Sequence, residues 1–518
     1  PTLRKLMLNR YPFAVRSPSF IPTATIILLG SFLFFHGLGD RELTSSHEAR
    51  AGQNAAVILE TGQWGLPRLF DEQIELQKPP LYYWLVALVA WLHGAVDGWA
   101  VRLPAALAAL ACALLLYALL RRQGRPVAGF VAACVLATCW HFTWLARVGR
   151  IDMPLTLAVT AALGCFYLGG ASWRWRAVGY TAIGLGVLLK GPIAIVFVAI
   201  VAVAQMMVGR WCVTSPQREQ GPPLLALRTG CSMAVGAALG ALIAGPWFVW
   251  ANRQTSGRLW DVFFVYHNFE RGFGSETLAA HPWWFYAARF WINALPWSLL
   301  VPAAAWLVWK KGWWRDDTVC RLGMVWFLTI GSLLSLMRFK RADYLLPAFP
   351  GLALFLGAVA ERWWAEARPR WAPAALAGTL LGYAACWGVN LHLHDDAWPY
   401  RTAAQKLRTL AGPDAPIIFF RAEAHPLAFH LRRPLGSILE WENLEIWANE
   451  PRPVYFVMPA DYAREWAQLL RHAPFEEVFP LGDLLDAKHD RDLVVLRNIT
   501  KREAAQRAFF ILSKGTRE

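Results

Sequence analysis

A single lysine stands at the head of an apolar run. In the stretch IELQKPPLYYW, from Ile74 to Trp84, Lys78 precedes two prolines and then aromatic and aliphatic residues. A lysine at the start of a membrane segment can simply hold its charged end at the lipid–water interface. It can also supply the positive charge of a binding site. The choice depends on which polar residues lie on the same side of the membrane.

Two acidic residues stand where a catalytic carboxylate would be expected. Asp152 begins an apolar segment, and Glu48 lies in a loop of mostly neutral residues. Ionisable groups at membrane depth are candidates for function by default. A carboxylate acting as base, opposite cations that hold a departing phosphate, is the arrangement of a group-transfer site.

Basic residues also gather at predicted span ends on the side where short loops should contain few of them. They are Arg147, Arg150, Lys190, Arg338, Lys340 and Arg341. A bound anion would explain this placement, and arginine and lysine donors suit a phosphate. Because the sequence has neither a Walker loop nor a GxGxxG followed by an acidic residue, we interpret the anion as a lipid phosphate rather than a nucleotide.

Each of these residues also has a purely structural interpretation. Asp152 can cap a helix N-terminus, and Glu48 can pair with Arg50. The other structural interpretations are an interfacial belt for Tyr344, a span break for Lys190, an internal hydrogen bond for His267 and contact with anionic headgroups for Arg338–Arg341.

The composition is that of a membrane protein. Of 518 residues, 56% are hydrophobic and 17% are charged, whereas soluble chains contain about 45–50% apolar residues. Long apolar runs recur from about Ser19 to Asn390, so most of the chain is predicted to be an integral membrane domain. The net charge of +15 is spread over short loops, which is typical of membrane topology and not of a nucleic-acid-binding surface. None of the eight cysteines forms a CxxC pair, which argues against a zinc site and a disulfide framework.

The basic loops define the predicted topology. Five are assigned to the cytoplasm by the positive-inside rule: Arg121–Arg125, Arg174–Arg176, Arg210–Arg228, Lys310–Arg321 and Arg362–Arg370. Eleven spans follow, at about 21–38, 101–120, 126–142, 153–170, 176–189, 192–209, 229–250, 285–309, 320–337, 344–361 and 371–391. The odd number places the N-terminus inside and the C-terminal domain outside. The segment 81–95 is short for a span and is predicted to be an outer juxtamembrane helix, which leaves a range of 11–13 crossings.

Two domains are predicted. Residues 1–391 form the transmembrane domain, with 39–100 as its first outer loop, and 392–518 form a small outer α/β domain. There, PIIFF, PVYFVMP and DLVVLRN are typical of strands, and AHPLAFHLR and DYAREWAQLLRHA are typical of helices. The tail KREAAQRAFFILSKGTRE is interpreted as a surface helix.

The order of the motifs resembles a known family. HEAR, KPPLYYW, RIDM, LLKGP, NFER and YLLPAFP follow one another as in the polyprenyl-phosphate-dependent glycosyltransferases of GT-C type. The resemblance is closest to the lipid A aminoarabinose transferases and more distant to the protein O-mannosyltransferases. It covers about residues 20–360 and implies a mainly α, polytopic fold that uses a lipid-linked sugar donor.

The resemblance also implies roles for individual residues. The candidate catalytic acids are Asp152 and Glu48. The implied ligands of the donor phosphate are Lys78, Arg271, Arg50, Tyr344, Lys340 and Arg338. The remaining candidates for substrate binding are His47, Lys190, His267, Tyr82 and Tyr83.

Three positions depart from the family pattern. His47 stands where relatives have an aspartate, while Gln77 and Asn268 replace a glutamate and a histidine that could bind a divalent metal. Neutral amides are poor ligands for zinc. We therefore expect no tightly bound metal, and at most a weakly held divalent ion.

The predicted protein is a multi-pass, monomeric glycosyltransferase of the bacterial inner membrane with its site facing the periplasm. It would transfer a sugar, with inversion, from undecaprenyl phosphate to lipid A, another glycolipid, a glycan or a protein, among membrane lipids and without nucleic acid. The alternatives are a flippase for lipid-linked sugars, which would need mid-span charges and repeated halves, and an inactive scaffold. The sugar, the acceptor and the choice of Glu48 or Asp152 as base stay open.

Overall fold

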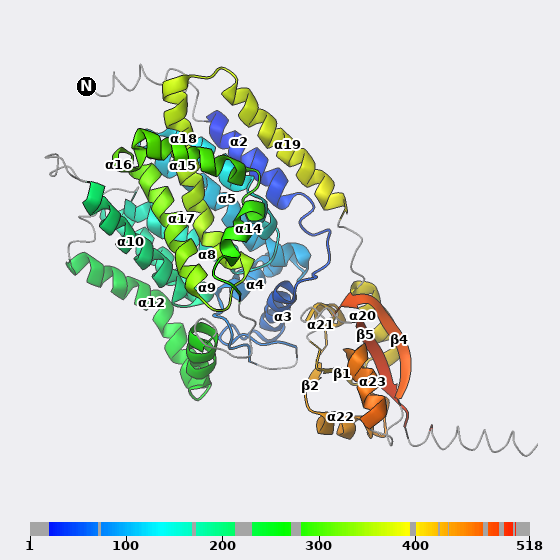
Figure 1. Ribbon diagram of the computed structural model, residues 1–518. Helices are drawn as coiled ribbons and strands as arrows, with labels where there is room; N and C mark the ends of the chain where they lie inside the picture. Colours follow the sequence, from blue (N-terminus) through cyan, green and yellow to red (C-terminus); the bar gives the residue numbers. More distant parts are fainter. Residues whose placement is uncertain are drawn as a thin grey trace, which may run out of the picture. The chain divides into compact units, whose positions relative to one another are not determined.

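The fold was obtained as a computed structural model, shown in Figure 1. It describes residues 20–70, 74–167, 172–212, 230–270, 281–393, 400–422, 425–433, 435–469, 475–485, 492–500 and 503. The chain divides into two compact units, each described by itself below. The first is Pro1–Leu38, Leu76–His93 and Trp99–His392, and the second is Gly39–Glu75, Gly94–Gly98 and Leu393–Glu518.

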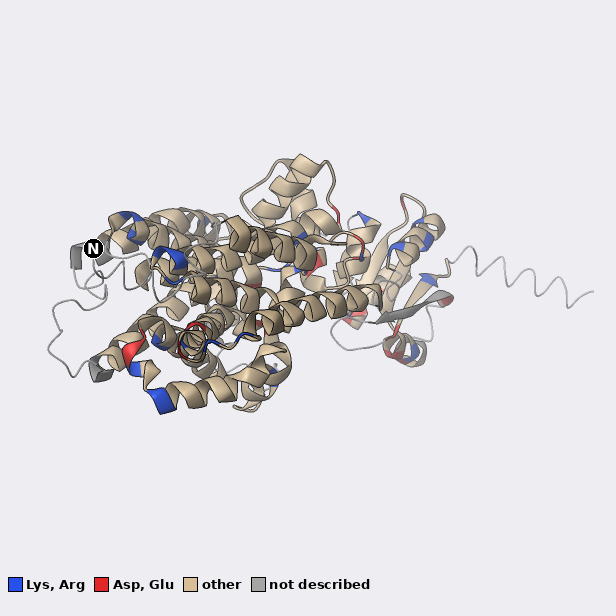
Figure 2. Ribbon diagram, turned by 90° about the horizontal axis from the view of Figure 1, so that it is seen from above, with Lys and Arg blue, Asp and Glu red and all other residues tan. Residues whose placement is uncertain are grey.

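The first unit is built from helices. In chain order these are α2 (Phe20–Gly30), η1 (Ser31–Phe35), α4 (Leu81–His93), α5 (Gly98–Arg122), α6 (Pro126–Ala137), α7 (Trp140–Ala146), α8 (Asp152–Tyr167), α9 (Trp173–Lys190), α10 (Ile193–Cys212), α12 (Gly230–Gln254), η3 (Trp260–Glu270), α14 (Phe285–Asn293), η4 (Trp297–Leu300), α15 (Val301–Lys311), α16 (Trp313–Asp316), α17 (Thr318–Leu336), η5 (Ala342–Ala348), α18 (Phe349–Ala367) and α19 (Ala372–Leu393). Figure 2 shows few charged residues along the long helices.

A helix occupies each of the eleven predicted spans, but two of these spans are broken. The chain bends by 69° between α6 and α7, and by 109° between α14 and the helix Trp297–Lys311. Within the described residues, five helices are long and apolar enough to cross a membrane, or seven if each bent pair is one span. The exact number of crossings stays a prediction.

Helices α17 and α18 approach each other closely through two glycines. A Cβ atom on Gly323 would lie 2.4 Å from the backbone nitrogen of Phe355, and one on Gly351 would lie 2.8 Å from the ring of Trp326. Small residues at such crossings let membrane helices pack backbone to backbone. The contact fixes the start of α18, and with it η5, which carries Tyr344.

An ion network joins three of the predicted cytoplasmic loops. Asp317 accepts hydrogen bonds from Arg125 Nη1 at 2.7 Å and from Arg362 Nε at 2.8 Å. Arg125 Nε also donates to Glu361 Oε2 at 2.6 Å. Because Arg125, Asp317 and Arg362 come from three different basic loops, these loops lie at one end of the helices, as the threading predicted.

The second unit contains a mixed five-stranded sheet. The strands are β1 (Ile417–Phe420), β2 (Gly436–Ile438), β3 (Tyr455–Pro459), β4 (Phe475–Leu485) and β5 (Asp492–Asn498), in the order β2-β1-β3-β5-β4. Strands β2, β1 and β3 are parallel, while β5 is antiparallel to β3 and β4. The helices of this unit are α3 (Ser46–Thr61), α20 (Tyr400–Ala411), α21 (His425–Leu431), α22 (Trp441–Ala448) and α23 (Ala460–Leu469).

The predicted strands and helices of this unit are present. PIIFF, PVYFVMP and DLVVLRN contain β1, β3 and β5, and the two predicted helices overlap α21 and α23. Strands β2 and β4 were not predicted. The predicted surface helix in the tail lies almost entirely outside the described residues.

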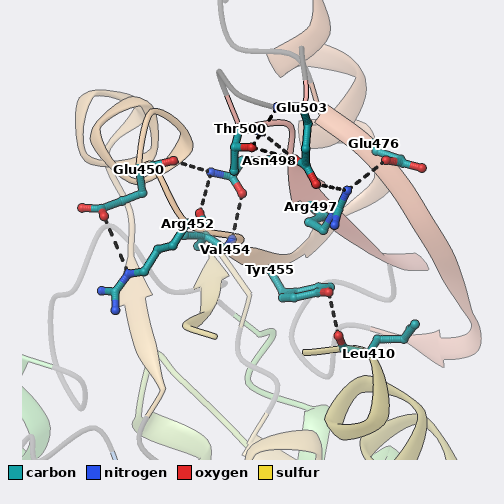
Figure 3. A network of polar contacts seen from close by, with 10 residues as sticks. All are labelled: Leu410, Glu450, Arg452, Val454, Tyr455, Glu476, Arg497, Asn498, Thr500 and Glu503. Carbon is teal, nitrogen blue, oxygen red and sulfur yellow. Dashed lines mark hydrogen bonds and ion pairs between the residues drawn. The ribbon is translucent and has the colours of Figure 1, made fainter. Parts of the chain in front are cut away.

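Asn498 forms a network of hydrogen bonds at the end of strand β5 (Figure 3). Its Oδ1 accepts the backbone N–H of Val454 at 2.7 Å, and its Nδ2 lies 3.1–3.2 Å from three carbonyl oxygens near the end of α22. The side chain of Asn498 is fully buried. Such a satisfied amide ties β5 to the loop before β3 without leaving an unpaired polar group.

Helix α3 is held inside the second unit by α21. The side-chain amide of Gln53 donates from Nε2 to the carbonyl oxygen of His425 at 3.2 Å. A Cβ atom on Gly52 would lie 2.5 Å from the ring of Phe429. The helix that carries His47, Glu48 and Arg50 is therefore packed against the C-terminal part of the chain.

Candidate functional site

A cavity of about 100 Å³ opens at the ends of several helices of the first unit. It is lined by Asp152, Leu155, Lys190, Ile193, Phe197, His267, Leu334, Met337, Phe339, Tyr344 and Pro347. Most of this wall is apolar, and the few polar groups are concentrated on α8, α9, η3 and η5. A mostly apolar cavity with a few convergent polar groups is the usual form of a ligand site.

The cavity contains an ion pair between the ends of two neighbouring helices. Asp152 is the first residue of α8 and Lys190 is the last residue of α9, and these helices pack side by side. Lys190 Nζ lies 2.5 Å from Asp152 Oδ1 and 4.3 Å from the centroid of the Tyr344 ring. The ammonium group is thus held between a carboxylate and an aromatic face, which is a favourable cation–π geometry.

Glycine is required immediately after Lys190. Gly191 has a φ of +75°, and a Cβ atom there would lie 2.5 Å from the ring of Phe263. Residues with a side chain rarely adopt this backbone conformation. The KGP motif therefore ends α9 at a residue whose side chain faces the cavity.

A chain of alternating charges extends from this pair. Arg150 Nε lies 3.3 Å from Asp152 Oδ2, and Arg150 Nη2 lies 2.5 Å from Asp343 Oδ2. Arg341 Nε lies 3.2 Å from the same oxygen of Asp343. We call Lys190, Asp152, Arg150, Asp343 and Arg341 the ion chain. Asp152 is only 3% exposed, and a cation lies within 3.3 Å of each of its two oxygens.

Lys78 joins this group from the first predicted outer loop. It lies close enough to Asp152 to interact with it electrostatically. With Lys78, four cations face two carboxylates, which gives the group a formal charge of +2. Of this group, Lys190 and Asp152 line the cavity, and a net positive charge beside a partly apolar cavity favours an anionic ligand.

Two other predicted phosphate ligands have structural contacts. Lys340 is buried, and its Nζ donates to the carbonyl of His281 at 2.9 Å and to the carbonyl of Met337. Arg338 is exposed, and its carbonyl accepts the N–H of His281 at 3.2 Å. These contacts tie the segment after α17 to the segment before α14. The segment that follows leads directly into η5 and Tyr344.

The predicted aromatic residues of α4 are buried. The hydroxyl of Tyr82 donates to the carbonyl of Val101 at 2.8 Å, and neither Tyr82 nor Tyr83 is more than 3% exposed. Tyr82 therefore anchors α4 to α5. The contacts of these two side chains are those of packing within the first unit.

Three of the predicted residues, His47, Glu48 and Arg50, fall elsewhere. Glu48 is buried in the first turn of α3, where the backbone N–H of His47 donates to Ser45 Oγ at 3.3 Å. Arg50 forms an ion pair with Glu75, with Nε 2.8 Å from Oε2. All of these residues belong to the second unit, whereas the cavity belongs to the first. Arg271 lies outside the described residues.

Sequence reasoning missed two members of the site region. Asp343 received no role, although an acid next to Tyr344 and among three cations is a readable signal. His141 on α7 is buried, interacts electrostatically with Asp343 and Asp152, and has an Nε2 without a hydrogen-bond partner in the described part of the chain. It lies in an apolar stretch, and nothing in that stretch indicates proximity to a charge cluster.

The described residues contain no group of three or more histidine, cysteine, aspartate or glutamate side chains that could hold a metal ion. The cavity wall itself provides Asp152 and His267. The same wall also presents the ammonium group of Lys190 and the ring hydroxyl of Tyr344, both of which can hold an anion.

Known proteins resemble this chain over part of its length. A family model described as dolichyl-phosphate-mannose-protein mannosyltransferase matches residues 77–219. The undecaprenyl phosphate-alpha-4-amino-4-deoxy-L-arabinose arabinosyl transferase of Pseudomonas aeruginosa is 29% identical over 344 residues, which cover 65% of this chain and 59% of that protein. The transferase of the same name from Erwinia tasmaniensis is 29% identical over 326 residues, which cover 61% and 55%. The chain thus spans less than two thirds of these relatives.

Solved structures share the fold. The crystal structure of ArnT from Cupriavidus metallidurans bound to undecaprenyl phosphate matches with a TM-score of 0.74 and 18% identity, covering 93% of this chain and 99% of that chain. The predicted resemblance to ArnT-like GT-C glycosyltransferases is confirmed. The predicted fold class, a mainly helical polytopic membrane protein with a C-terminal α/β domain, is confirmed with it. The archaeal oligosaccharyltransferase AglB from Archaeoglobus fulgidus matches with a TM-score of 0.55 and 12% identity, covering 85% and 69%.

The part of this chain that matches the family model includes much of the site. Lys78, Arg150, Asp152 and Lys190 all fall within residues 77–219, whereas Tyr344 lies beyond them. The lining residues from His267 to Pro347, which include Tyr344 and Pro347 of η5, are therefore outside the matched region.

Proposed function

We propose that this chain is a membrane glycosyltransferase that moves a sugar from an undecaprenyl-phosphate-linked donor to a periplasmic acceptor. The observation that carries the proposal is the place of Lys190, a cation in an apolar cavity that Asp152 and the Tyr344 ring hold in position. The names of the curated relatives, which are arabinosyl transferases that use undecaprenyl phosphate, support the donor class.

The donor phosphate binds at the positive end of the cavity. Lys190 and Lys78 face the phosphate, and Tyr344 hydrogen-bonds the phosphate or the sugar. Arg271 contributes a further donor from the fourth outer loop. Each cation that meets the charge developing on the departing phosphate is worth about 3–4 kcal/mol of transition-state stabilisation. The apolar wall, from Leu155 to Pro347, accommodates the adjoining isoprene units.

Transfer is a single displacement with inversion. The acceptor oxygen attacks the anomeric carbon from the face opposite the phosphate and forms the new carbon–oxygen bond. The bond from the anomeric carbon to the phosphate oxygen breaks, and its electron pair stays on undecaprenyl phosphate. The acceptor proton passes to water. We assign Asp152 to the positioning of Lys190 and Arg150, because both of its oxygens already face cations.

The acceptor is lipid A, another glycolipid, a glycan or a protein. The chain acts as a monomer in the bacterial inner membrane, where the cavity and residues 392–518 face the periplasm. Membrane lipids and the lipid-linked donor are its partners, and the reaction needs no tightly bound metal. The orientation of the cavity and of residues 392–518 is the one that the positive-inside rule predicts from the basic loops.

The test uses the full-length protein in proteoliposomes with undecaprenyl-phosphate sugars carrying aminoarabinose, galacturonic acid or mannose. The wild type should release undecaprenyl phosphate, and Lys78→Ala should abolish release while the protein stays folded. Lys311→Ala, in an exposed ion pair with Glu366, is the matched control and should keep full activity. A flippase would move the donor without cleaving it, and a scaffold would do neither.

Mass spectrometry completes the test. Envelope glycolipids and glycoproteins from cells with and without the protein should differ by the mass of one sugar, which identifies both sugar and acceptor. Release of undecaprenyl phosphate by Lys78→Ala at the wild-type rate would show that Lys78 does not act in the site. Failure of the wild type with every donor, together with an unchanged envelope, would reject the proposed function.

A further inference from the structure

We propose that Arg150 and Asp343 are a positioning pair that sets both Lys190 and Tyr344 in the cavity. Nothing in the family match covers Asp343, which lies beyond residues 77–219. The effect on donor binding rests on the proposed function. The effect on the position of Tyr344 does not.

The pair connects the start of α8 to the start of η5, two elements that also pack against each other. Arg150 comes just before α8, and Asp343 is the second residue of η5. The Arg150 side chain is 12% exposed and that of Asp343 is 14% exposed, with Nη2 and Oδ2 2.5 Å apart. A guanidinium group is planar and offers donors on two edges, so Arg150 can bind Asp343 with one edge and Asp152 with another.

Asp343 directly determines where the next residue lies. The 3-10 helix η5 follows an irregular stretch, and the N–H of Tyr344 donates to the carbonyl of Arg341 at 3.1 Å. Asp343 is held from both sides, by Arg150 and by Arg341 Nε at 3.2 Å. Fixing this carboxylate fixes the start of η5, and the ring of Tyr344 then lies beneath Lys190.

Asp343 also influences which cation binds which oxygen of Asp152. Arg150 and Lys190 both approach the Asp152 carboxylate, at 3.3 and 2.5 Å. An arginine with one carboxylate partner tends to bind it with two parallel hydrogen bonds. Without Asp343, Arg150 would take both oxygens of Asp152 and compete with Lys190. The second carboxylate draws Arg150 away and leaves Oδ1 to Lys190.

The first arm of the test needs no donor. The full-length protein carries 3-fluorotyrosine at position 344 in lipid nanodiscs, and its fluorine resonance is recorded. Asp343→Asn, which keeps the shape and removes the charge, should shift or broaden the resonance. Lys311→Ala, at the exposed ion pair with Glu366 outside the site, is the control and should leave the resonance unchanged. A resonance unchanged in Asp343→Asn would overturn the proposal.

The second arm measures the affinity for undecaprenyl phosphate from intrinsic tryptophan fluorescence. Asp343→Asn should weaken binding about tenfold, and the conservative Asp343→Glu should restore it to within about threefold of the wild type. In the Asp152→Asn background, Asp343→Asn should weaken binding less than twofold further, because the two residues act through Arg150. Losses that simply multiply would overturn the proposal.

The two arms separate this inference from the proposed function. A wild type that does not bind undecaprenyl phosphate would reject the function, and the fluorine resonance would still decide the role of the pair. Elution volume and the far-ultraviolet spectrum identify any variant that fails to fold. Should Asp343→Asn misfold, Arg150→Lys takes its place in the fluorine arm, with the same expected shift and the same contradicting result.

Discussion

Lys190 Nζ lies 2.5 Å from Asp152 Oδ1, although 38 residues separate them in the chain. The pair forms because α8 begins where α9 ends, at the wall of the cavity. A cation in this position is held by one charge and faces a space that can take another. The functional predictions below depend on this relationship.

Replacing Lys190 by methionine should remove transfer but not the fold. Methionine keeps the length of the side chain, and loss of one preorganised donor lowers kcat by about 100- to 1,000-fold. The measurement is the rate of undecaprenyl phosphate release in proteoliposomes. Lys311→Met, at an exposed ion pair, should stay within about twofold of the wild type. A loss of less than threefold in Lys190→Met would exclude this residue from the transition state.

Replacing Asp152 by asparagine should destabilise the first unit. Lys190 and Arg150 would keep their charges without the carboxylate between them, and breaking a buried ion pair from one side costs about 3 kcal/mol. The measurement is the free energy of unfolding of the full-length protein in detergent. The double variant Asp152→Asn/Lys190→Met should recover part of this loss while staying inactive. A double variant less stable than either single variant would contradict the pairing.

The opposite end of the helices offers a prediction that concerns stability alone. Asp317 is buried, binds Arg125 and Arg362, and caps α17 by accepting the N–H groups of Val319 and Cys320. Asp317→Ala should lower the free energy of unfolding by at least about 3 kcal/mol, because it removes a helix cap and takes a buried carboxylate partner from two arginines.

The neighbouring Asp316 provides the control for this experiment. It is exposed, so Asp316→Ala should change the free energy of unfolding by less than about 0.5 kcal/mol. Thermal and denaturant unfolding in detergent measure both variants. Equal effects of the two substitutions would show that Asp317 does not organise this end of the helices.

His430 makes the second unit sensitive to acid. Burial, and then Arg401, Arg432 and Arg408, lower the pKa of His430 to about 4 from its ordinary value of 6.5. The unfolded chain therefore takes up this proton at a higher pH than the folded unit, and stability falls as pH drops from about 6.5 to 4. The loss is about 1–3 kcal/mol, since the side chain is partly exposed.

Replacing His430 by glutamine should remove this pH dependence. The measurement is hydrogen exchange of β1 and β3 in the full-length protein between pH 6.5 and 4.5, corrected for the intrinsic rate. The variant should lose less protection on acidification than the wild type. His392→Gln, at an exposed histidine of the first unit, serves as the control. Identical acid sensitivity in wild type and His430→Gln would contradict the assignment.

Much of the fold could be predicted from local sequence. Apolar runs of about 20 residues identify membrane helices because the free energy of burying them in lipid is a sum over neighbouring residues. Strands β1, β3 and β5 were recognised because they are compact apolar runs. Strand β2 has only the residues GSI, and its pairing with β1 rather than its own composition makes it a strand. The break between α6 and α7 was also missed, since Thr138 and Cys139 do not interrupt the apolar pattern.

The sequence by itself determined that the chain enters a membrane, that basic loops alternate with apolar spans, and that Asp152, Lys190 and Tyr344 stand at span ends. Only the tertiary structure decided which charged residues form ion pairs with one another. It paired Arg50 with Glu75, Arg150 with both Asp152 and Asp343, and Arg125 with Asp317, 192 residues away. The physical reason is that hydrophobicity is read along the chain, whereas an ion pair depends on a few ångströms between residues that helix packing brings together.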